Sequence, residues 1–149
     1  MTRAEIVGDI ELDGATLEAL VAHARSDFPY EVCGLLAGEG GQVRAHYAIP
    51  NAERSMTYYA MDSRALLAAM RAMEDRDWEL LAIYHSHTHT EAFPSPTDVE
   101  LAFYPEAVYL IVSLQDAEAP VIRGFDILEG RVTERRVLVD GEEAAAGAR

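Results

Sequence analysis

The chain has 149 residues, a length typical of one ordinary domain, and its 50% hydrophobic and 26% charged residues are the balance of a globular protein. Its 12 Lys and Arg are outnumbered by 26 Asp and Glu, so the formal net charge at pH 7 is -14. Phosphate backbones and anionic lipids repel a chain this acidic, which argues against nucleic acid and membrane surfaces as partners.

The cysteine and histidine content indicates in which cellular compartment the protein works and which kinds of metal site it can form. Cys33 is the single cysteine, so the chain has no internal disulfide and no cysteine-rich zinc knuckle. No apolar run approaches the roughly 20 residues that span a bilayer, and the N-terminus lacks the basic-then-apolar order of a signal peptide. We therefore expect a cytoplasmic protein in which any metal site uses histidine and carboxylate. None of the five histidines follows His89.

The apolar pattern predicts strands and helices within one domain. Helices are expected over 15–26 and 63–76, the second capped by Asp62, and a short helix begins at Ser95-Pro96. Their mixture, without a strict strand–helix–strand rhythm, indicates a layered α/β (α+β) fold. We expect the domain to span 1–140, followed by a polar, disordered tail over 141–149. The expected strands are 4–12, 31–38, 43–49, 78–87, 107–114, 121–128 and 131–139.

The most informative segment is 85–98, with the sequence HSHTHTEAFPSPTD. His85 and His87 lie two residues apart at the end of a predicted strand, where residues i and i+2 point to the same face. Two adjacent imidazoles suit zinc, and a catalytic zinc typically takes three protein ligands and one water. Asp98 is the strongest candidate for the third ligand, because the loop before it is long enough to double back.

Each of these residues also has a purely structural interpretation. Ser95 and Asp98 have the spacing of a capping box, with serine at the N-cap and an acid three residues later. The histidine pair can lie at a strand end without binding metal. His89 is expected to follow the end of the strand, so we place it in a loop or on the substrate side. Spacing alone leaves these alternatives open.

This segment resembles the signature of the JAMM (MPN+) metalloproteases, H-[ST]-H-x7-S-x2-D, because seven residues separate His87 from Ser95 and two separate Ser95 from Asp98. That family also has an acidic residue on an early strand, and Glu31 in PYEVCGLLAG lies at the matching place. The resemblance covers most of the chain. It implies a single MPN/JAMM domain, with a mixed central sheet flanked by helices and layered like the cytidine deaminases.

The resemblance implies a role for each residue of the signature. His85, His87 and Asp98 are expected to hold one Zn²⁺ per chain, which lowers the pKa of a bound water towards about 7. Glu31 is expected to take a proton from that water and pass it to the leaving amine. Ser95 is expected to donate a hydrogen bond to the oxyanion, typically worth about 10²–10³ in rate. Its remaining lone pairs can still cap the helix.

Within the family, the chain is most similar to the bacterial Mec-type enzymes, through the stretches FPYEVCGLLAG, NAERS and RAMED and the metal motif. Those enzymes cleave the bond between the C-terminal glycine of a ubiquitin-like sulfur-carrier protein and a cysteine, and so release cysteine for cysteine biosynthesis. The resemblance implies a small carrier ending in Gly-Gly as partner, and the acidic charge favours a basic face on that carrier.

Two other functions within this family, and the oligomeric state, are left open. One is an isopeptidase that removes a ubiquitin-like modifier from lysine. The other is a non-catalytic MPN-like scaffold, against which the complete signature argues. A homodimer is compatible with the sequence, which does not decide the oligomeric state.

A cupin-like barrel is the alternative outside this family. His85, His87 and Glu91 have the His-x-His-x3-Glu spacing of cupins. A cupin usually takes another histidine from a later strand, and none follows His89. The two predicted helices also fit poorly with a small barrel.

Two further features have competing interpretations. Cys33 lies in the apolar run VCGLL, which is typical of a buried, unreactive thiol and less so of a nucleophile. Tyr58 and Tyr59 could line a peptide channel, or they could be half-buried as tyrosines in strands commonly are.

Overall fold

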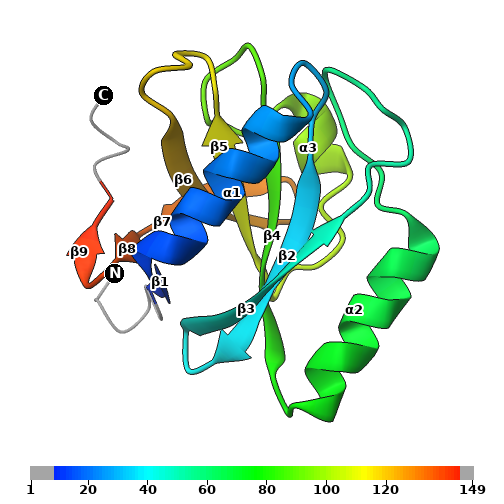
Figure 1. Cartoon of the computed structure of the whole chain (residues 1–149), viewed down its shortest axis with the longest axis vertical. Helices are drawn as coiled ribbons and strands as arrows, with labels where there is room; N and C mark the ends of the chain where they lie inside the picture. The colour runs from blue at the N-terminus through cyan, green and yellow to red at the C-terminus, as the bar shows by residue number, and fades with distance from the viewer. Residues whose placement is uncertain (1–8, 145–149) are drawn as a thin grey trace.

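One mixed sheet runs through residues 9–144, the part of the chain that this computed structural model describes (Figure 1). Its strand order is β7-β6-β5-β4-β2-β3-β1-β8-β9. The pairs β4–β5, β1–β3 and β1–β8 are parallel, and the other pairs are antiparallel, so the predicted mixed sheet is confirmed. The strands are β1 (Ile10–Leu12), β2 (Cys33–Glu39), β3 (Gln42–Ile49), β4 (Glu79–His87), β5 (Val108–Ser113), β6 (Val121–Leu128), β7 (Arg131–Arg135), β8 (Val137–Val139) and β9 (Glu142–Glu143).

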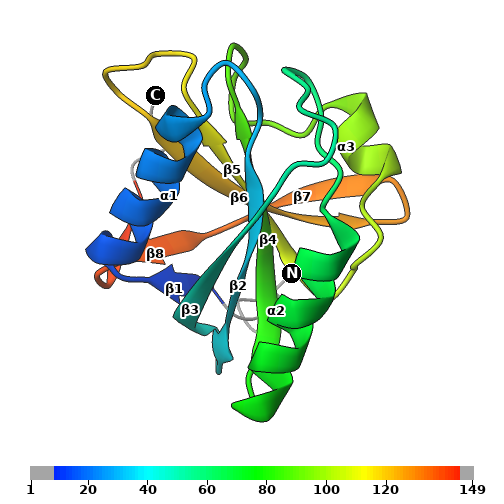
Figure 2. The ribbon, with the colours of Figure 1, turned by 45° about the vertical axis from the view of Figure 1, so that its right-hand side comes forward.

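Helices cover both faces of this sheet, as expected for an α/β fold. α1 (Gly14–Ser26) and α2 (Ser63–Asp75) lie on opposite sides of β2 and β4, and α3 (Pro96–Glu100) lies at one end (Figure 2). Asp13 and Asp62 cap the two long helices, accepting hydrogen bonds from Thr16 N at 2.8 Å and Ala65 N at 2.9 Å. Within the described range, none of the helices is long and apolar enough to cross a membrane.

The core has two layers because successive side chains of a strand point to opposite faces of the sheet. Ala82 and Tyr84 of β4 pack on the α1 side with Leu20, while Ile83 packs on the α2 side with Met73. His85 and His87 continue the Ile83 series, so the sheet carries both imidazoles on the face that α2 covers. The predicted i, i+2 relationship is therefore present in the fold.

The pairing of β2 with β4 determines what lies opposite the histidines. These strands are antiparallel, with Cys33 opposite His85. Two residues further along, the same register places Glu31 opposite His87 and on the same face. Backbone contacts continue the pairing past the end of β2, since Ser86 N donates to Val32 O at 3.1 Å.

The C-terminal strands differ from the prediction. The single strand expected over 131–139 is two strands, β7 and β8, joined at Arg136. β7 pairs with β6 at one edge of the sheet, whereas β8 pairs with β1 near the other edge. The sheet is therefore curled, which brings its two edges close together. Arg136 lies where the chain passes from β7 to β8, and it forms an ion pair with Asp9 at 2.7 Å.

The predicted strand and the predicted tail at the two ends of the chain lie only partly within the described residues. Of the strand expected over 4–12, the structure has β1 at Ile10–Leu12, and residues 4–8 lie outside the described part. Within the expected tail, Glu142 and Glu143 form β9 against β8. Residues 145–149 lie outside the described part, so the domain boundary at 140 stays a prediction.

Candidate metal centre

Three potential ligand atoms converge at the end of β4. This end of the strand lies near the start of β2 and near α3 (Figures 1 and 2). His85 Nε2 lies 3.2 Å from His87 Nε2. Asp98 Oδ2 lies 2.9 Å from His87 Nε2 and 3.2 Å from His85 Nε2. All three residues are buried. The sheet thus supplies two nitrogens from one strand, and the first turn of α3 supplies the oxygen.

The separations between these atoms fit a zinc ion. Ligands at about 2.0–2.1 Å from a tetrahedral zinc lie roughly 3.3 Å from one another. The observed separations of 2.9–3.2 Å are close to this value. Two imidazoles and one carboxylate are also a donor set that zinc accepts, and they leave a fourth position for water. The residues present therefore fit the metal that the sequence predicts.

The imidazole of His87 is held in the form that binds metal. Its Nδ1 donates to the backbone oxygen of Glu91 at 2.8 Å, which leaves the lone pair of Nε2 directed at the site. Burial lowers the pKa of His85, which favours its neutral form, whereas the pKa of His87 is raised because hydrogen bonds to Asp98 and to the Glu91 carbonyl outweigh its burial. Burial raises the pKa of Asp98, but hydrogen bonds to His85 and His87 hold it well below its ordinary value, so the carboxylate stays charged.

Glu31 adds a buried carboxyl group beside the ligands. It is 3% exposed, and its Oε1 has no hydrogen-bond partner among the described residues. Burial raises its pKa to about 8, although His87 partly opposes this. A general base works best with a pKa near the operating pH. Its environment therefore suits a group that gains and loses a proton near neutral pH.

The backbone of Glu31 is fixed from both neighbouring segments. Glu31 N donates to Ser55 O at 2.8 Å, and Asn51 Nδ2 donates to Glu31 O at 3.0 Å. On the other side, Val32 N donates to Ser86 Oγ at 2.9 Å. The loop 50–62 and strand β4 together hold the residue in position.

Ser95 begins α3 at the edge of the site. Its Oγ accepts a hydrogen bond from Asp98 N at 3.0 Å, and Asp98 Oδ2 accepts one from Ser95 N at 2.9 Å. The predicted capping box is therefore present. Ser95 is half-buried, and the hydrogen of its hydroxyl is still available to donate.

Three other residues discussed from the sequence lie around the ligands. His89 is exposed outside the ligand cluster, and its ring packs against Phe28 with centroids 5.2 Å apart. Cys33 is fully buried and donates to Ile49 O at 3.4 Å, and burial raises its pKa to about 12. An unreactive thiol is therefore favoured over a nucleophile. Tyr59 stacks on His85, with centroids 4.7 Å apart.

Several supporting residues were not found by sequence reasoning. Asn51 and Ser55 hold Glu31 in place and the Glu91 carbonyl holds His87, yet no spacing marks these contacts. Asn51 and Ser55 do lie in NAERS, one of the stretches that carries the family resemblance. That stretch was the available signal, but only the fold shows that its contacts are with Glu31.

The fold and the site together correspond to a JAB/MPN-domain hydrolase. The family described as "Prokaryotic homologs of the JAB domain" matches residues 14–127. The chain belongs to this family, whose members are metal-dependent hydrolases. The resemblance to JAMM enzymes and the prediction of a hydrolase are confirmed.

Two curated relatives cover most of the chain. The CysO-cysteine peptidase of Mycobacterium tuberculosis (strain ATCC 25618 / H37Rv) is 51% identical over 125 residues, which are 83% of this chain and 86% of that protein. The probable TtuB-protein conjugate cleaving protease of Thermus thermophilus is 42% identical over 123 residues, 82% of this chain and 78% of that protein.

Solved structures have the same fold. Protein DSY2949 from Desulfitobacterium hafniense has a TM-score of 0.80 and 37% identity, over 89% of this chain and 94% of that one. AF2198, a JAB1/MPN domain protein from Archaeoglobus fulgidus, has a TM-score of 0.57 and 18% identity, over 87% of this chain and 99% of that one. The second likeness concerns the fold alone, and it confirms the predicted MPN-type architecture.

Proposed function

We propose that this protein is a zinc-dependent hydrolase that cleaves the bond between the C-terminal glycine of a ubiquitin-like sulfur-carrier protein and a cysteine, releasing cysteine. The proposal is carried by one observation, the convergence of His85, His87 and Asp98 beside a buried Glu31. The similarity to a CysO-cysteine peptidase supports the choice of substrate. A cytoplasmic location stays a prediction, and the oligomeric state stays open.

The chain's own groups divide the chemistry between them. Zinc held by His85, His87 and Asp98 would supply Lewis acidity, which makes water a nucleophile near neutral pH. Glu31 takes a proton from the attacking water and returns it to the leaving nitrogen, so a C–O bond forms as the C–N bond breaks and no net proton is lost. The Ser95 hydroxyl donates to the oxyanion while its oxygen still accepts from Asp98 N.

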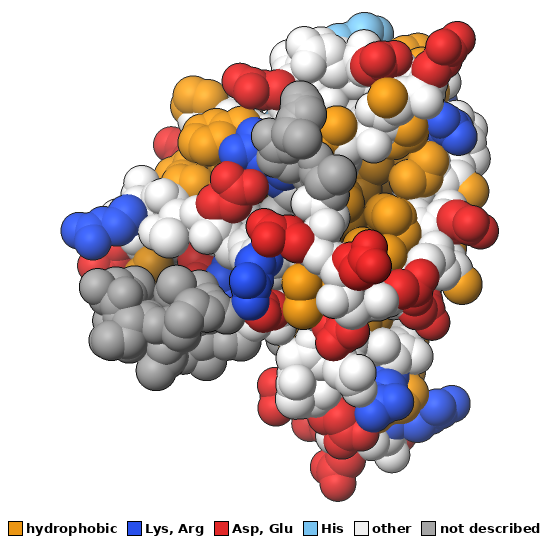
Figure 3. Space-filling model, turned by 90° about the vertical axis from the view of Figure 1, so that its left-hand side faces the viewer, with side chains coloured by type: hydrophobic (Ala, Val, Ile, Leu, Met, Phe, Trp, Pro, Cys, Tyr) orange, Lys and Arg blue, Asp and Glu red, His pale blue; other side chains and the backbone are white. Residues whose placement is uncertain are grey.

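The surface charge supports a basic partner. Acidic side chains are spread over the face drawn in Figure 3, in keeping with the net charge of -14. Opposite charge on the carrier would speed encounter, and this effect weakens as salt screens it. We propose that the carrier presents a basic face and that its extended Gly-Gly tail enters the site.

An isopeptidase acting on lysine conjugates is the second candidate. It is favoured by the similarity to a protein named as a TtuB-protein conjugate cleaving protease. The two candidates use the same ligands and base, and they differ in the amine that leaves. A non-catalytic scaffold is disfavoured, because every position of the metal signature is filled.

Glu31→Gln tests the proposed chemistry on the full chain. The variant should keep about one zinc per chain and lose nearly all turnover of a carrier–cysteine adduct. Glu39→Gln, at the opposite end of β2, is the matched control and should keep both. Turnover that survives in Glu31→Gln removes Glu31 from its proposed role, and a wild-type protein with zinc but no turnover favours the scaffold.

Substrate choice is tested with three amide substrates at equal concentration. These are the carrier–cysteine adduct, the same carrier linked to a lysine side chain, and a Gly-Cys dipeptide. We expect the adduct to be cleaved fastest and the dipeptide not at all. Faster release of lysine selects the isopeptidase, and equal cleavage of the dipeptide contradicts recognition of the carrier.

A further inference from the structure

The two candidate imidazole ligands are supported differently. The second ring nitrogen of His87 donates a hydrogen bond to the Glu91 carbonyl at 2.8 Å, which is the usual arrangement for a ligand histidine. His85 Nδ1 is buried and has no hydrogen-bond partner among the described residues. Something other than a hydrogen bond must therefore hold the plane of the His85 ring, since a rotation of this ring would carry Nε2 away from Asp98.

Tyr59 is in contact with the face of that ring. The centroids of Tyr59 and His85 lie 4.7 Å apart and their planes are inclined by 28°, which is a stacked arrangement. Stacking restricts a ring because rotation out of the parallel plane loses the contact. Within residues 9–144, no other aromatic ring stacks on His85, and the ring of His87 lies beside it in a tilted arrangement.

We propose that Tyr59 is a positioning residue for His85, and that ring stacking replaces the hydrogen bond that a ligand histidine ordinarily makes. This inference rests on the proposed metal site and needs no particular substrate. It gives the tyrosine a purpose different from lining a peptide channel. It also predicts that the ring of residue 59 matters for metal binding and that its hydroxyl group does not.

Tyr59 can orient another ring only if it is itself fixed, and Asn51 fixes the backbone on both sides of it. Asn51 Oδ1 accepts from Ala60 N at 3.0 Å, and Asn51 Nδ2 donates to Tyr58 O at 3.3 Å. Ala52 N also donates to Ala60 O at 2.8 Å. The Tyr59 ring packs against the apolar layer on the α2 side. These contacts hold Tyr59 through residues other than the candidate metal ligands.

The experiment compares zinc affinity among variants of the full chain, by competition with a chromophoric chelator on metal-free protein. Tyr59→Leu removes the ring and should weaken zinc binding by about 10–100-fold, the usual effect of losing a group that orients a ligand. Tyr59→Phe keeps the ring and should bind zinc like the wild type. Tyr59→Met, which also lacks a ring but has a longer and more flexible side chain, replaces the leucine variant if that one does not fold.

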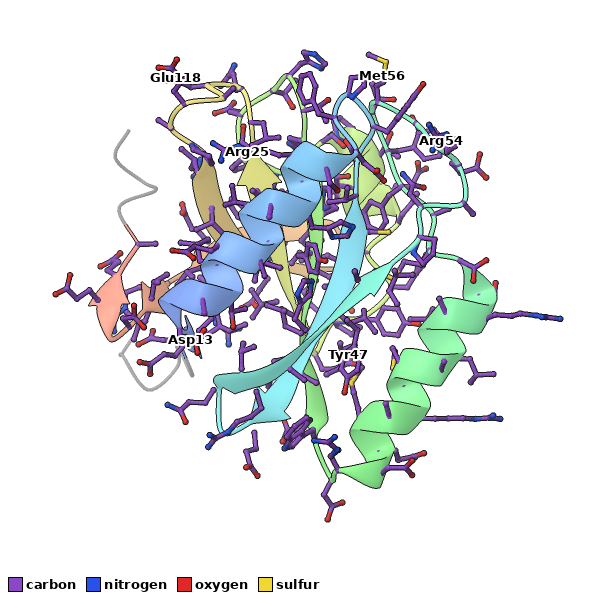
Figure 4. The ribbon with its side chains drawn as sticks, viewed as in Figure 1. Asp13, Arg25, Tyr47, Arg54, Met56 and Glu118 are labelled. Carbon is purple, nitrogen blue, oxygen red and sulfur yellow. The ribbon has the colours of Figure 1, made fainter. Side chains whose placement is uncertain are left out.

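Tyr47→Leu is the matched control. Tyr47 packs on the same apolar layer but makes no recorded ring contact with a histidine, and it lies away from the loop that carries Arg54 and Met56 (Figure 4). Its loss should lower stability without changing zinc affinity. The absorption spectrum of the Co²⁺-loaded protein, which reports ligand geometry, should change in Tyr59→Leu and stay unchanged in Tyr59→Phe and Tyr47→Leu.

The possible failures are distinguishable. A wild-type protein that binds no zinc overturns the proposed metal site and this inference together. If the wild type binds zinc and folded Tyr59→Leu binds it equally well, only this inference is overturned. An equal loss of affinity in Tyr59→Phe overturns it too, because the hydroxyl and not the ring would then be responsible.

Discussion

Asp98 Oδ2 accepts a hydrogen bond from Ser95 N at 2.9 Å and lies 2.9 Å from His87 Nε2. One oxygen thus both closes the capping box of α3 and faces the candidate metal site. This cap orients the carboxylate of Asp98, because it fixes the side chain relative to the start of the helix. The structural and the functional interpretations of Asp98 describe the same contact geometry.

Replacing Asp98 should therefore have two separable effects. In Asp98→Ala, zinc content should fall from about one per chain to near zero, because the charged ligand is lost. The free energy of unfolding of the metal-free protein should fall by about 1 kcal/mol, the usual cost of losing a helix cap. Metal analysis and urea unfolding measure the two. Asp62→Ala, which uncaps α2, should lose similar stability and keep its zinc, whereas stoichiometric zinc in Asp98→Ala would contradict the ligand assignment.

Ser95→Ala tests the oxyanion donor. Loss of one such donor should lower kcat by about 10²–10³ while zinc content stays near one per chain. KM should change little, because the bond forms in the transition state. Ser95→Thr keeps a hydroxyl and should retain more activity. Steady-state kinetics on the carrier–cysteine adduct provide the check, and a Ser95→Ala enzyme with wild-type kcat removes this role.

Asn51→Asp examines how Glu31 is held. The substitution keeps the oxygen that accepts from Ala60 N and removes the amide that donates to Glu31 O and to Tyr58 O. A buried carbonyl left without its donor typically costs about 1–3 kcal/mol, so stability should fall. The kcat of the zinc-loaded variant should fall as Glu31 loses its position. Glu53→Gln, a change in the same loop, is the comparison, and an unaltered kcat in folded Asn51→Asp would show that Glu31 does not depend on this contact.

A half-buried polar cluster on the α1 side of the sheet predicts a pH effect on stability. Tyr84 Oη lies 2.7 Å from His23 Nδ1 and 2.6 Å from His46 Nε2, and burial lowers the pKa of both histidines below 6.5. Below pH 6.5 the unfolded chain binds protons that the folded protein does not. The free energy of unfolding should therefore fall with decreasing pH, by at most about 1.4 kcal/mol per pH unit for each histidine, until the lowered pKa is passed.

The variant His46→Gln measures how much the cluster contributes to this pH dependence of stability. Its free energy of unfolding should depend less steeply on pH below 6.5 than that of the wild type. His89→Gln makes the same change at an exposed histidine outside the cluster and serves as the comparison. Urea unfolding at several pH values, with metal content held constant, gives the slopes. Identical slopes for wild type and His46→Gln would rule out the cluster as the source.

The sequence predicts local relationships well. The i, i+2 periodicity of β4 is enough to place His85 and His87 on one face, and the spacing of Ser95 and Asp98 is enough to predict the capping box. Glu31 was found only through the family resemblance, because a single acid next to a strand has no signature of its own. Its place opposite His87 depends on the antiparallel register of β2 and β4, which no local pattern encodes.

Contacts between distant segments were the part that sequence reasoning missed. The chain from 131 to 139 has a uniform strand pattern, but the curl of the sheet divides it between two edges. Asn51 is an ordinary loop residue until the fold brings Glu31 to its amide. The sequence marks Tyr59 as an aromatic near the site, yet its contact with His85 follows from the path of loop 50–62.

The segments that carry the candidate ligands differ in local stability. β4 is paired along both sides, with β2 and β5, so the two imidazoles belong to the part of a protein that opens last. Asp98 belongs to a helix of five residues, which is too short to be stable by itself. Exchange of bound zinc with the solution should accordingly follow the local opening of α3. The lifetime of the bound metal would then be set by the residues around this helix, while the sheet stays folded.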